Sequence, residues 1–358
     1  MNTAPHHIIK FGTDGWRGVI ADAFTFDNVR IVSQAVADML REQGKTDDGV
    51  VIGYDNRFHG ENFARTVAEV LAGNDIPVRL GETPVPTPVI SFAARHYGMS
   101  GGVMITASHN PADYSGVKFK TPDGASAGRE ITGEIESRVG ASSVRSRDLD
   151  SAAENGLVMD FPLEDPYLQW VANFVDTKSL ATGAFRVVVD SMYGVGKRYI
   201  EELLADTRHE VTTIRSERNP GFNGIAPEPV PKNMEATVAA VEKCAADVAL
   251  VTDGDADRLA ALDNRGEYII TPRIATIIAR HLIDNRGWSG SLIKTLSCSV
   301  TVDRFARERG IEVHEEPVGF KNIVPYLLRG DALLGTEESG GLGFKNHIPE
   351  RDGLLAGI

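Results

Sequence analysis

The sequence lacks long apolar runs, paired cysteines and the features of an exported protein. Only two of its 358 residues are cysteines, Cys244 and Cys298, and neither stands in a paired ligand motif. A disulfide framework is therefore not expected, and a reducing cytoplasm is the predicted location. No apolar run approaches the roughly 20 residues that span a bilayer, and residues 1–12 lack the charged and apolar regions of a secretory signal. We expect no membrane partner.

An excess of positive charge is also missing. The 50 acidic side chains outnumber the 37 of Lys and Arg and leave a net charge of −13. Binding to a nucleic acid normally requires a basic face, so we expect no nucleic-acid partner. An anionic small substrate is not excluded, because a local cluster of cations and backbone N–H groups can outweigh the global charge. The remaining composition is typical of a globular protein, and the length favours two to three domains.

Apolar runs of strand length alternate with longer amphipathic segments along the chain. Three such rounds are expected. The first has strands at 50–55, 76–80 and 101–108 and a helix across 61–72, and the second has strands at 185–190, 209–214 and 247–255 and a helix near 194–205. The third has strands at 291–299 and 311–316 and a helix near 301–309. Parallel strands are buried on both faces and therefore read as continuous apolar runs. The sequence predicts α/β layers with mixed, mainly parallel sheets. The similar size and element order of the rounds indicate diverged repeats.

Two breaks divide these rounds. Residues 140–160 are polar and rich in small residues, which predicts a linker, and residues 263–267 predict a hairpin turn or a domain junction. At the C-terminal end, Asp352 and Gly353 predict the start of a helix, with residues 354–358 as its first turn. Because a helix of five residues is not stable alone, we expect the chain to stop within an element.

The first candidate motif is TASHNP (106–111), called the serine loop below. Ser108 follows an apolar strand, and the carboxyl end of a strand is where α/β sheets present reactive groups. From spacing alone an ordinary Ser/Asn/Pro turn fits equally well. The glycines of the G-x-S-x-G nucleophile elbow are absent, so an acyl-transfer triad has no support.

The second motif is TDGDADR (252–258), called the aspartate loop below. Asp253, Asp255 and Asp257 alternate directly after an apolar strand and can turn their oxygens towards one point. Carboxylate oxygens are preferred ligands of hard cations such as Mg²⁺. Such crowded carboxylates repel one another unless a cation neutralises them, and Arg258 is one candidate. A solvated acidic turn is the alternative.

The third motif is GTEESGG (335–341), called the glutamate loop below. Its paired glutamates, Ser339 and two glycines suit hydrogen bonds to sugar hydroxyls, although a flexible acidic turn is equally compatible. The segments PVGFK (317–321) and FGTDGWRG (11–18) each set a basic residue, Lys321 or Arg17, among glycines, as anion sites do. GVKFK (116–120) brings Lys118 close in sequence to the serine loop.

Taken together, these segments resemble the α-D-phosphohexomutase family, which includes phosphoglucomutase, phosphomannomutase and phosphoglucosamine mutase. The motifs GTDGWRG, TASHNP, DGDADR, GFK and EESGG occur in the family's order, from about residue 9 to the end of the chain. The resemblance implies three consecutive α/β domains whose sheets are sandwiched by helices, with the active site in the cleft between them. We expect domain I at 1–150, domain II at 156–264 and domain III at 265–358.

The resemblance also implies roles for single residues. Ser108 would be the phosphoserine, and one Mg²⁺ per active site would be held by Asp253, Asp255 and Asp257 together with a phosphoserine oxygen. Phosphoryl transfer depends mainly on positioning and on charge neutralisation, which this set supplies. Phospho-Ser108 would convert a hexose monophosphate into a hexose 1,6-bisphosphate, which reorients and returns its other phosphate to Ser108. Lys118 is the leading candidate for proton transfer, assisted by Arg17 and His109.

Substrate contacts are implied in the same way. Glu337 and Ser339 would bind sugar hydroxyls, while the remaining residues of the cleft would be Arg258, Lys321, Arg351 and Asp352. EESGG and the adjacent GFK are similar to phosphoglucomutases, whereas phosphoglucosamine mutases more often have a glutamine in that loop and dual-specificity phosphomannomutases more often have E-x-S-G-H. We therefore expect a glucose phosphate as the substrate, with mannose and glucosamine phosphates as alternatives. We expect a monomer or weak homodimer.

One feature of the family has no counterpart in the sequence. Nothing like the R-x-S-G-T-E-P phosphate loop of the family's fourth domain follows Ile358. We therefore expect a truncated form that binds metal but has reduced mutase activity.

Two other hypotheses stay open. DVALVTDGD resembles the nucleophile strand of haloacid-dehalogenase phosphatases, although Asp257 stands where those enzymes need Thr or Ser, and a non-catalytic sugar-phosphate-binding protein would keep the cleft without using Ser108.

Overall fold

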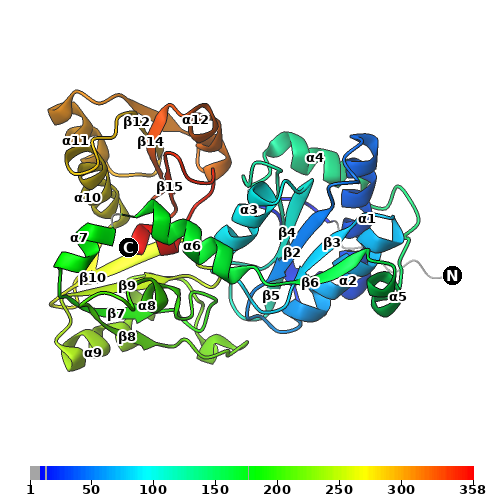
Figure 1. Cartoon of the computed structure of the whole chain (residues 1–358), viewed down its shortest axis with the longest axis horizontal. Coiled ribbons are helices and arrows are strands. Elements are labelled where there is room, and N and C mark those ends of the chain that lie inside the picture. The colour runs from blue at the N-terminus through cyan, green and yellow to red at the C-terminus, as the bar shows by residue number, and fades with distance from the viewer. Residues whose placement is uncertain (1–8, 13, 176) are drawn as a thin grey trace. The chain divides into compact units, whose positions relative to one another are not determined.

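The computed structural model of the chain describes residues 9–12, 14–175 and 177–358 (Figure 1). Residues 1–8, on which part of the expectation about a secretory signal rests, and Thr13 of the motif at 11–18 lie outside the described residues. The contacts divide the chain into two compact units. The first comprises Met1–Val85, Val89–Ala107 and Ala112–Leu163, and the second comprises Pro86–Pro88, Ser108–Pro111 and Glu164–Ile358. Within the described ranges, no helix is long and apolar enough to cross a membrane.

The first unit is an α/β layer structure. Its elements are β1 (Trp16–Val19), α1 (Phe26–Glu42), β2 (Val50–Tyr54), α2 (Gly60–Gly73), β3 (Val78–Gly81), α3 (Thr87–His96), β4 (Gly101–Ile105), β5 (Tyr114–Lys120), α4 (Arg129–Arg138), α5 (Leu149–Glu154) and β6 (Val158–Phe161). In the described part of this unit the strand order is β1-β5-β4-β2-β3-β6. Strands β2, β3, β4 and β6 run parallel, while β5 is antiparallel to both β4 and β1.

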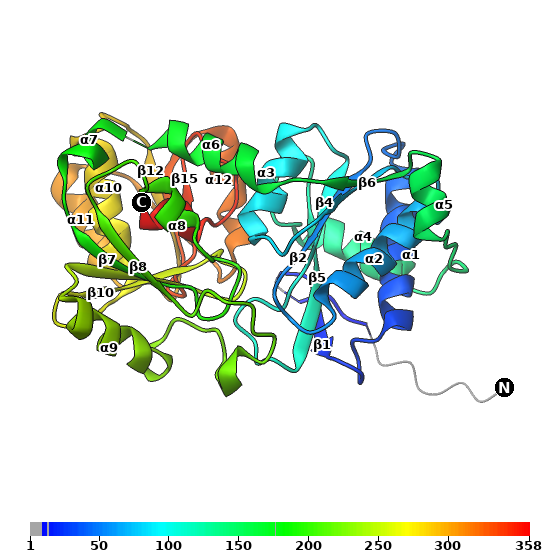
Figure 2. The ribbon, with the colours of Figure 1, turned by 60° about the horizontal axis from the view of Figure 1, so that its bottom comes forward.

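The helices of the first unit cover both faces of its sheet. Figures 1 and 2 show α1 and α2 on one face and α3 on the other. The crossovers explain this arrangement, because the chain passes from β2 to β3 in one direction and from β3 to β4 in the other, and parallel crossovers keep one hand. On α1, residues Val29, Val32 and Val36 are fully or almost fully buried, which is the spacing of a helix with one apolar face. They belong to one core with Phe63 of α2.

The second unit contains two further sheets. Its helices and strands are α6 (Glu164–Phe174), α7 (Thr177–Thr182), β7 (Arg186–Asp190), α8 (Tyr199–Leu203), β8 (Glu210–Ile214), α9 (Glu235–Cys244), β9 (Val248–Thr252), β10 (Leu259–Asp263), β11 (Tyr268–Ile269), α10 (Thr271–Asp284), β12 (Ser291–Thr295), α11 (Thr301–Arg309), β13 (Val313–Glu316), α12 (Val324–Arg329), β14 (Ala332–Thr336), β15 (Leu342–Phe344) and α13 (Gly353–Gly357). Short 3₁₀ segments occur at Phe222–Gly224 (η1), Pro231–Asn233 (η2) and Phe320–Asn322 (η3). Helix α9 covers one face of the β7–β10 sheet, and α8 and α13 cover the other (Figures 1 and 2).

The three sheets repeat one topology, as the sequence predicted. Over the described residues, each sheet contains four strands that follow one another in the chain. The first strand lies between the second and the third and runs parallel to both. The fourth strand is antiparallel to the third and forms a hairpin with it. These runs are β3-β2-β4-β5, β8-β7-β9-β10 and β13-β12-β14-β15. The serine, aspartate and glutamate loops each join the third strand of a repeat to its hairpin partner. The three candidate motifs therefore occupy the same topological position.

Most predicted elements are confirmed, and two predictions are wrong. The helix expected near 194–205 is limited to Tyr199–Leu203, because residues 192–198 form turns in which Met192, Tyr193 and Lys197 have positive φ. The linker expected at 140–160 is wrong where α5 and β6 form, and β6 extends the first sheet by pairing with β3. The break at 263–267 is the turn of the β10–β11 hairpin.

Candidate active site

The serine loop holds Ser108 in an unusual backbone conformation. Ser108 follows β4 and has φ of 53°, in the left-handed region that residues with a side chain seldom adopt. Residues held there cluster at functional sites. The side chain is 1% exposed, and its Oγ donates a hydrogen bond to Asp253 Oδ2 at 2.7 Å. His109 is half-buried, with its Nδ1 3.4 Å from Ser108 Oγ.

The aspartate loop gathers three buried carboxylates. Asp253, Asp255 and Asp257 are each 0% exposed, and one oxygen from each lies within 4.8 Å of the others. Burial raises the pKa of Asp253 well above its usual range, and the charges of Asp255 and Asp257 raise it further. Arg258 and the hydrogen bond from Ser108 act in the opposite direction. Three ionised carboxylates buried this close together destabilise the folded chain, and a bound cation would offset their repulsion.

The donor set fits a hard divalent cation. All three groups offer carboxylate oxygen, which is the ligand type that Mg²⁺ prefers over nitrogen or sulfur. The Ser108 oxygen lies in hydrogen-bond contact with one of these carboxylates. Among the described residues, this is the one cluster of His, Cys, Asp or Glu side chains with the spacing of a metal site.

Arg351 connects the aspartate loop to the glutamate loop. Its Nη2 lies 2.8 Å from Asp257 Oδ2, and its Nη1 lies 3.5 Å from Glu337 Oε2. Arg351 and Glu337 are both buried. Arg258 also contacts Asp257, at 3.8 Å from its Nε, and its backbone N–H donates to Asp253 Oδ1 at 3.2 Å. The structure thus brings together two of the three predicted arginines, Arg258 and Arg351, with Glu337 and the three aspartates.

The rest of the glutamate loop lies beside the aspartate loop. Arg258 and Gly341 form an antiparallel bridge, and the Leu259 N–H donates to the carbonyl of Gly340 at 3.0 Å. Ser339 is half-buried, and so is Lys321 in η3. Ser108 makes a hydrogen bond to Asp253 of the aspartate loop, whereas Ser339 lies in the glutamate loop and Lys321 in η3.

Glu338 is the more exposed glutamate of the loop. Partial burial would raise its pKa, but hydrogen bonds from Ser297 and Thr295 outweigh this effect and lower the pKa below its usual range. Glu338 is therefore ionised at neutral pH and fixed against the end of β12. The sequence motif alone did not predict that Glu338 and Glu337 have different environments.

Asp352, a predicted substrate contact, makes several hydrogen bonds within the second unit. Its carboxylate caps α13 by accepting from the N–H groups of Leu354 and Leu355, and it also accepts from the Tyr167 hydroxyl at 2.8 and 2.9 Å. His347 Nε2 lies 2.8 Å from Asp352 Oδ2. Burial raises the pKa of Tyr167 well above its usual value, so the phenol keeps its proton and donates. Asp352 has no exposed surface, and its role as a substrate contact stays a prediction.

Lys118 and Arg17 lie in the first unit and share one partner. Lys118 on β5 is 2% exposed and forms an ion pair with Asp14, with Nζ 3.0 Å from Oδ2. Arg17 lies on β1, which pairs with β5, and its Nη2 is 3.9 Å from the same oxygen. Sequence reasoning missed Asp14 as the common partner, although it belongs to the motif at 11–18.

Thr87 is a second residue that sequence reasoning missed. It lies in the short segment Pro86–Pro88 of the second unit, and its hydroxyl donates to Asp255 Oδ2 at 2.5 Å. No motif marked it, because a threonine between two prolines at the start of a helix is an ordinary helix start.

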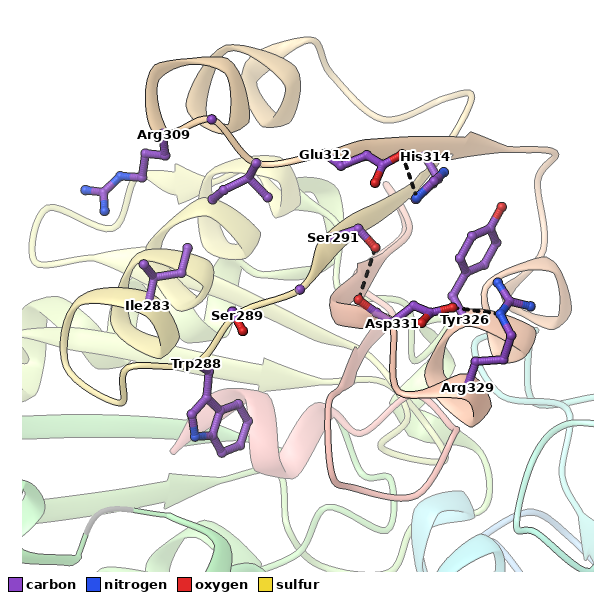
Figure 3. Close-up of a pocket in the computed structure, with 13 residues that line it drawn as sticks. Ile283, Trp288, Ser289, Ser291, Arg309, Glu312, His314, Tyr326, Arg329 and Asp331 are labelled. Carbon is purple, nitrogen blue, oxygen red and sulfur yellow. Dashed lines mark hydrogen bonds and ion pairs between the residues drawn. The ribbon is translucent and has the colours of Figure 1, made fainter.

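A separate cavity of about 880 Å³ lies at the amino end of the third sheet (Figure 3). Figure 3 shows Arg329 pointing towards Asp331 and His314 towards Glu312, at 2.7 and 3.5 Å. Its basic groups are thus already paired with carboxylates. No predicted site residue lines it, and functional groups of parallel sheets gather at the opposite, carboxyl ends of the strands.

Comparison with known proteins identifies the family of the chain. Family models for phosphoglucomutase/phosphomannomutase alpha/beta/alpha domains I, II and III match residues 9–145, 165–266 and 272–358. The chain belongs to the phosphoglucomutase/phosphomannomutase family. Its members are phosphohexomutases, which are isomerases that transfer a phosphoryl group within one substrate. The predicted fold of three α/β domains with mixed sheets is confirmed.

Individual relatives of this family carry several substrate names. A phosphoglucomutase/phosphomannomutase of Thermococcus kodakarensis is 29% identical, over 96% of this chain and 75% of the relative. A phosphoglucosamine mutase of Cereibacter sphaeroides is 31% identical, over 97% of this chain and 77% of the relative. The crystal structure of a Thermus thermophilus protein that carries the name phosphomannomutase has a TM-score of 0.91 and 36% identity, over 98% of this chain and 78% of that one.

Proposed function

We propose that this phosphohexomutase interconverts hexose 1-phosphate and hexose 6-phosphate by way of a phosphorylated Ser108. The observation that carries the proposal is the 2.7 Å hydrogen bond from Ser108 Oγ to Asp253 within a cluster of three buried carboxylates. A serine oxygen held beside a cation site suits phosphoryl transfer, which depends on positioning and charge neutralisation. Asp253, Asp255 and Asp257 would hold Mg²⁺, which when bound supplies positive charge to the phosphoryl oxygens.

The reaction consists of two transfers in opposite directions. In the first, the bond between phosphorus and Ser108 Oγ breaks while phosphorus bonds to the free hydroxyl oxygen of a hexose monophosphate. The hydroxyl proton passes to a base, and Ser108 Oγ recovers a proton. The hexose 1,6-bisphosphate then presents its other phosphate. The bond between that phosphorus and its sugar oxygen breaks while phosphorus bonds to Ser108 Oγ, the sugar oxygen takes up a proton, and Ser108 Oγ loses one. After both transfers Ser108 again carries one phosphate and the hexose again carries one phosphate, so no co-reactant is consumed.

Lys118 is our candidate for proton exchange with the substrate hydroxyl. The ion pair with Asp14 at 3.0 Å restricts the position of the Lys118 ammonium group, which a proton-transfer group requires. Arg17 shares Asp14 and would assist by attracting phosphate, and His109 would assist beside Ser108.

The glutamate loop is our candidate for sugar recognition. Glu337 and Ser339 would bind sugar hydroxyls, and Arg258, Arg351 and Lys321 would attract phosphate or hydroxyl oxygens. Arg351 has a second task, because its contacts with Asp257 and Glu337 couple the metal-binding and sugar-binding loops. Removing Arg351 is therefore expected to affect both binding events.

We propose glucose phosphates as the preferred substrates, on the EESGG form of the glutamate loop. The names of the relatives support phosphomannomutase and phosphoglucosamine mutase activity equally well. Parallel assays with the 1-phosphates of glucose, mannose and glucosamine decide between them, and a higher kcat/KM for either competitor would refute the choice of glucose. The cytoplasmic location, the monomeric or weakly dimeric state and the domain boundaries at 1–150, 156–264 and 265–358 stay predictions.

The phosphoryl acceptor is tested by labelling. The chain is incubated with hexose 1,6-bisphosphate that carries radioactive phosphorus, and the labelled peptide is sequenced. We expect label on Ser108, and none in Ser108→Ala. Ser191→Ala is the matched control, because Ser191 is similarly buried and directly follows β7, the first strand of the next repeat. Label on Asp253 with release of inorganic phosphate would instead support a phosphatase, and unaltered turnover in Ser108→Ala would refute the mechanism.

A further inference from the structure

Thr87 makes two hydrogen bonds to a single residue of the aspartate loop, 168 positions away. Its hydroxyl donates to Asp255 Oδ2 at 2.5 Å, and its backbone N–H donates to the Asp255 carbonyl oxygen at 3.0 Å. Thr87 is 0% exposed, as is Asp255. The two bonds engage both the side chain and the backbone of the aspartate, so they restrict its rotation as well as its position.

The local sequence explains why these donors are available. Thr87 is the first residue of α3, and the first N–H groups of a helix have no partner within the helix. Pro86 and Pro88 have no N–H, so within the Pro86–Pro88 segment only Thr87 offers a backbone donor. A β-branched side chain has few χ1 rotamers, which keeps the hydroxyl in place.

Asp255 needs such an anchor more than an isolated carboxylate does. It lies within 4.8 Å of the ligand oxygens of Asp253 and Asp257, so like charges push it away from the position in which all three converge. Arg258 and Arg351 both contact Asp257, and the Ser108 hydroxyl and the Arg258 N–H both bind Asp253. Thr87 supplies the corresponding hydrogen bonds to Asp255.

We propose that Thr87 is a positioning residue that orients Asp255 for metal binding. The proposal rests on the metal site proposed above. A hydrogen bond to one carboxylate oxygen fixes the ligand's orientation before the cation arrives, which reduces the cost of assembling the site. The Thr87 hydroxyl neither binds the cation nor touches the substrate in this proposal.

The test is a direct measurement of metal binding to the whole chain. Mn²⁺ is titrated and its free concentration is followed by electron paramagnetic resonance, with Mg²⁺ affinity taken from competition. Thr87→Val keeps the size and branching of the side chain and removes the hydroxyl, and we expect it to weaken metal binding by about 10- to 100-fold. Thr87→Ser keeps the hydroxyl, and we expect its affinity within about threefold of the wild-type value. In the mutase assay, Thr87→Val should need more Mg²⁺ but recover most of its kcat when Mg²⁺ saturates.

Thr237→Val is the matched control in the same unit. Thr237 is also fully buried and also donates its hydroxyl to a buried carboxylate, that of Asp190, which is not a metal ligand. We expect this variant to bind Mn²⁺ like the wild type. If Thr87→Val does not fold, as judged by circular dichroism, Thr87→Ala removes the same hydroxyl with a smaller side chain.

The outcomes separate this inference from the metal site itself. A wild-type chain that fails to bind Mn²⁺ overturns the proposed metal site. Wild-type binding with equal affinity in the folded variant without the hydroxyl overturns the role of Thr87 alone. An equal loss in Thr87→Ser and Thr87→Val also overturns it, because the hydroxyl would then not be the cause. A lower melting temperature with unchanged affinity assigns Thr87 a purely structural role and is likewise a refutation.

Discussion

Asp253→Asn is expected to stabilise the metal-free chain while removing its response to Mg²⁺. Most substitutions of a buried, hydrogen-bonded residue destabilise a protein. Asp253 should differ, because it lies beside two other buried carboxylates and its pKa is raised well above the usual range. Asparagine has nearly the same shape and still offers an oxygen to the Ser108 hydroxyl, but its NH₂ group replaces the oxygen that accepts from the Arg258 N–H at 3.2 Å. We expect the loss of one negative charge to outweigh the loss of this hydrogen bond.

The magnitude follows from the spacing of the three carboxylates. Two unit charges 4.8 Å apart repel by about 3 kcal/mol at an effective dielectric constant of about 20. Asp253 has two such neighbours, but Arg258 and Arg351 offset part of the repulsion. We expect a net gain of about 2 kcal/mol, which for a unit of this size raises the melting temperature by about 4–8 °C. In the wild type, Mg²⁺ at a hundredfold excess over its Kd should stabilise by about 2.7 kcal/mol.

Thermal unfolding with and without Mg²⁺ measures both effects. Asp190→Asn is the control, and we expect its stability to change in the opposite direction. Asp190 is equally buried but pairs with Arg215, which the substitution would leave without its counter-charge. That variant should lose about 3–5 kcal/mol and keep its response to Mg²⁺. The reasoning is refuted if metal-free Asp253→Asn melts below the wild type, or if Mg²⁺ still raises its melting temperature.

Two further substitutions test the packing of the site. Gly254→Ala would place a Cβ 2.4 Å from the Ser108 carbonyl oxygen, which belongs to the backbone and cannot rotate away. We expect the serine loop to move and label transfer to Ser108 to fall by about a hundredfold, and an unchanged rate would contradict this. Tyr167→Phe removes the hydroxyl that donates to both oxygens of the buried Asp352. Urea unfolding should show a loss of about 1–3 kcal/mol with little change in kcat, and equal stability would contradict the structural role of Asp352.

The parallel strands could be predicted because helices cover both faces of their sheets. In β2, β4 and β14 every residue is buried, so an apolar run without alternation is the expected signal of a parallel strand covered on both faces. The chemical loops could be located for the same reason, since each follows such a run. The hairpin at 263–267 was visible from its turn residues, and the start of α13 from Asp352.

The errors arise from contacts that no local pattern contains. The helix expected near 194–205 begins late because the preceding turn packs against the aspartate loop, where a Cβ on Gly194 would lie 2.7 Å from the Gly254 carbonyl oxygen. The resemblance implied a substrate contact for Asp352, but it gave no sign of the hydrogen bond from Tyr167, 185 positions away. Thr87 was missed because its partner is 168 positions away.

The position of the aspartate loop between two other loops explains the small residues in its sequence. On one side, Gly254 lies against the Ser108 backbone, and on the other, Arg258 pairs with Gly341 in a β-bridge. Gly340 has φ of 101° and would place a Cβ 2.6 Å from the Leu259 carbonyl oxygen. At these positions a side chain would separate the loops, so glycine is needed for their close approach. The motifs D-G-D-A-D-R and E-E-S-G-G thus combine two requirements. Their charged residues include the proposed metal and sugar ligands, and their glycines allow the aspartate loop to contact Ser108 and the glutamate loop at once.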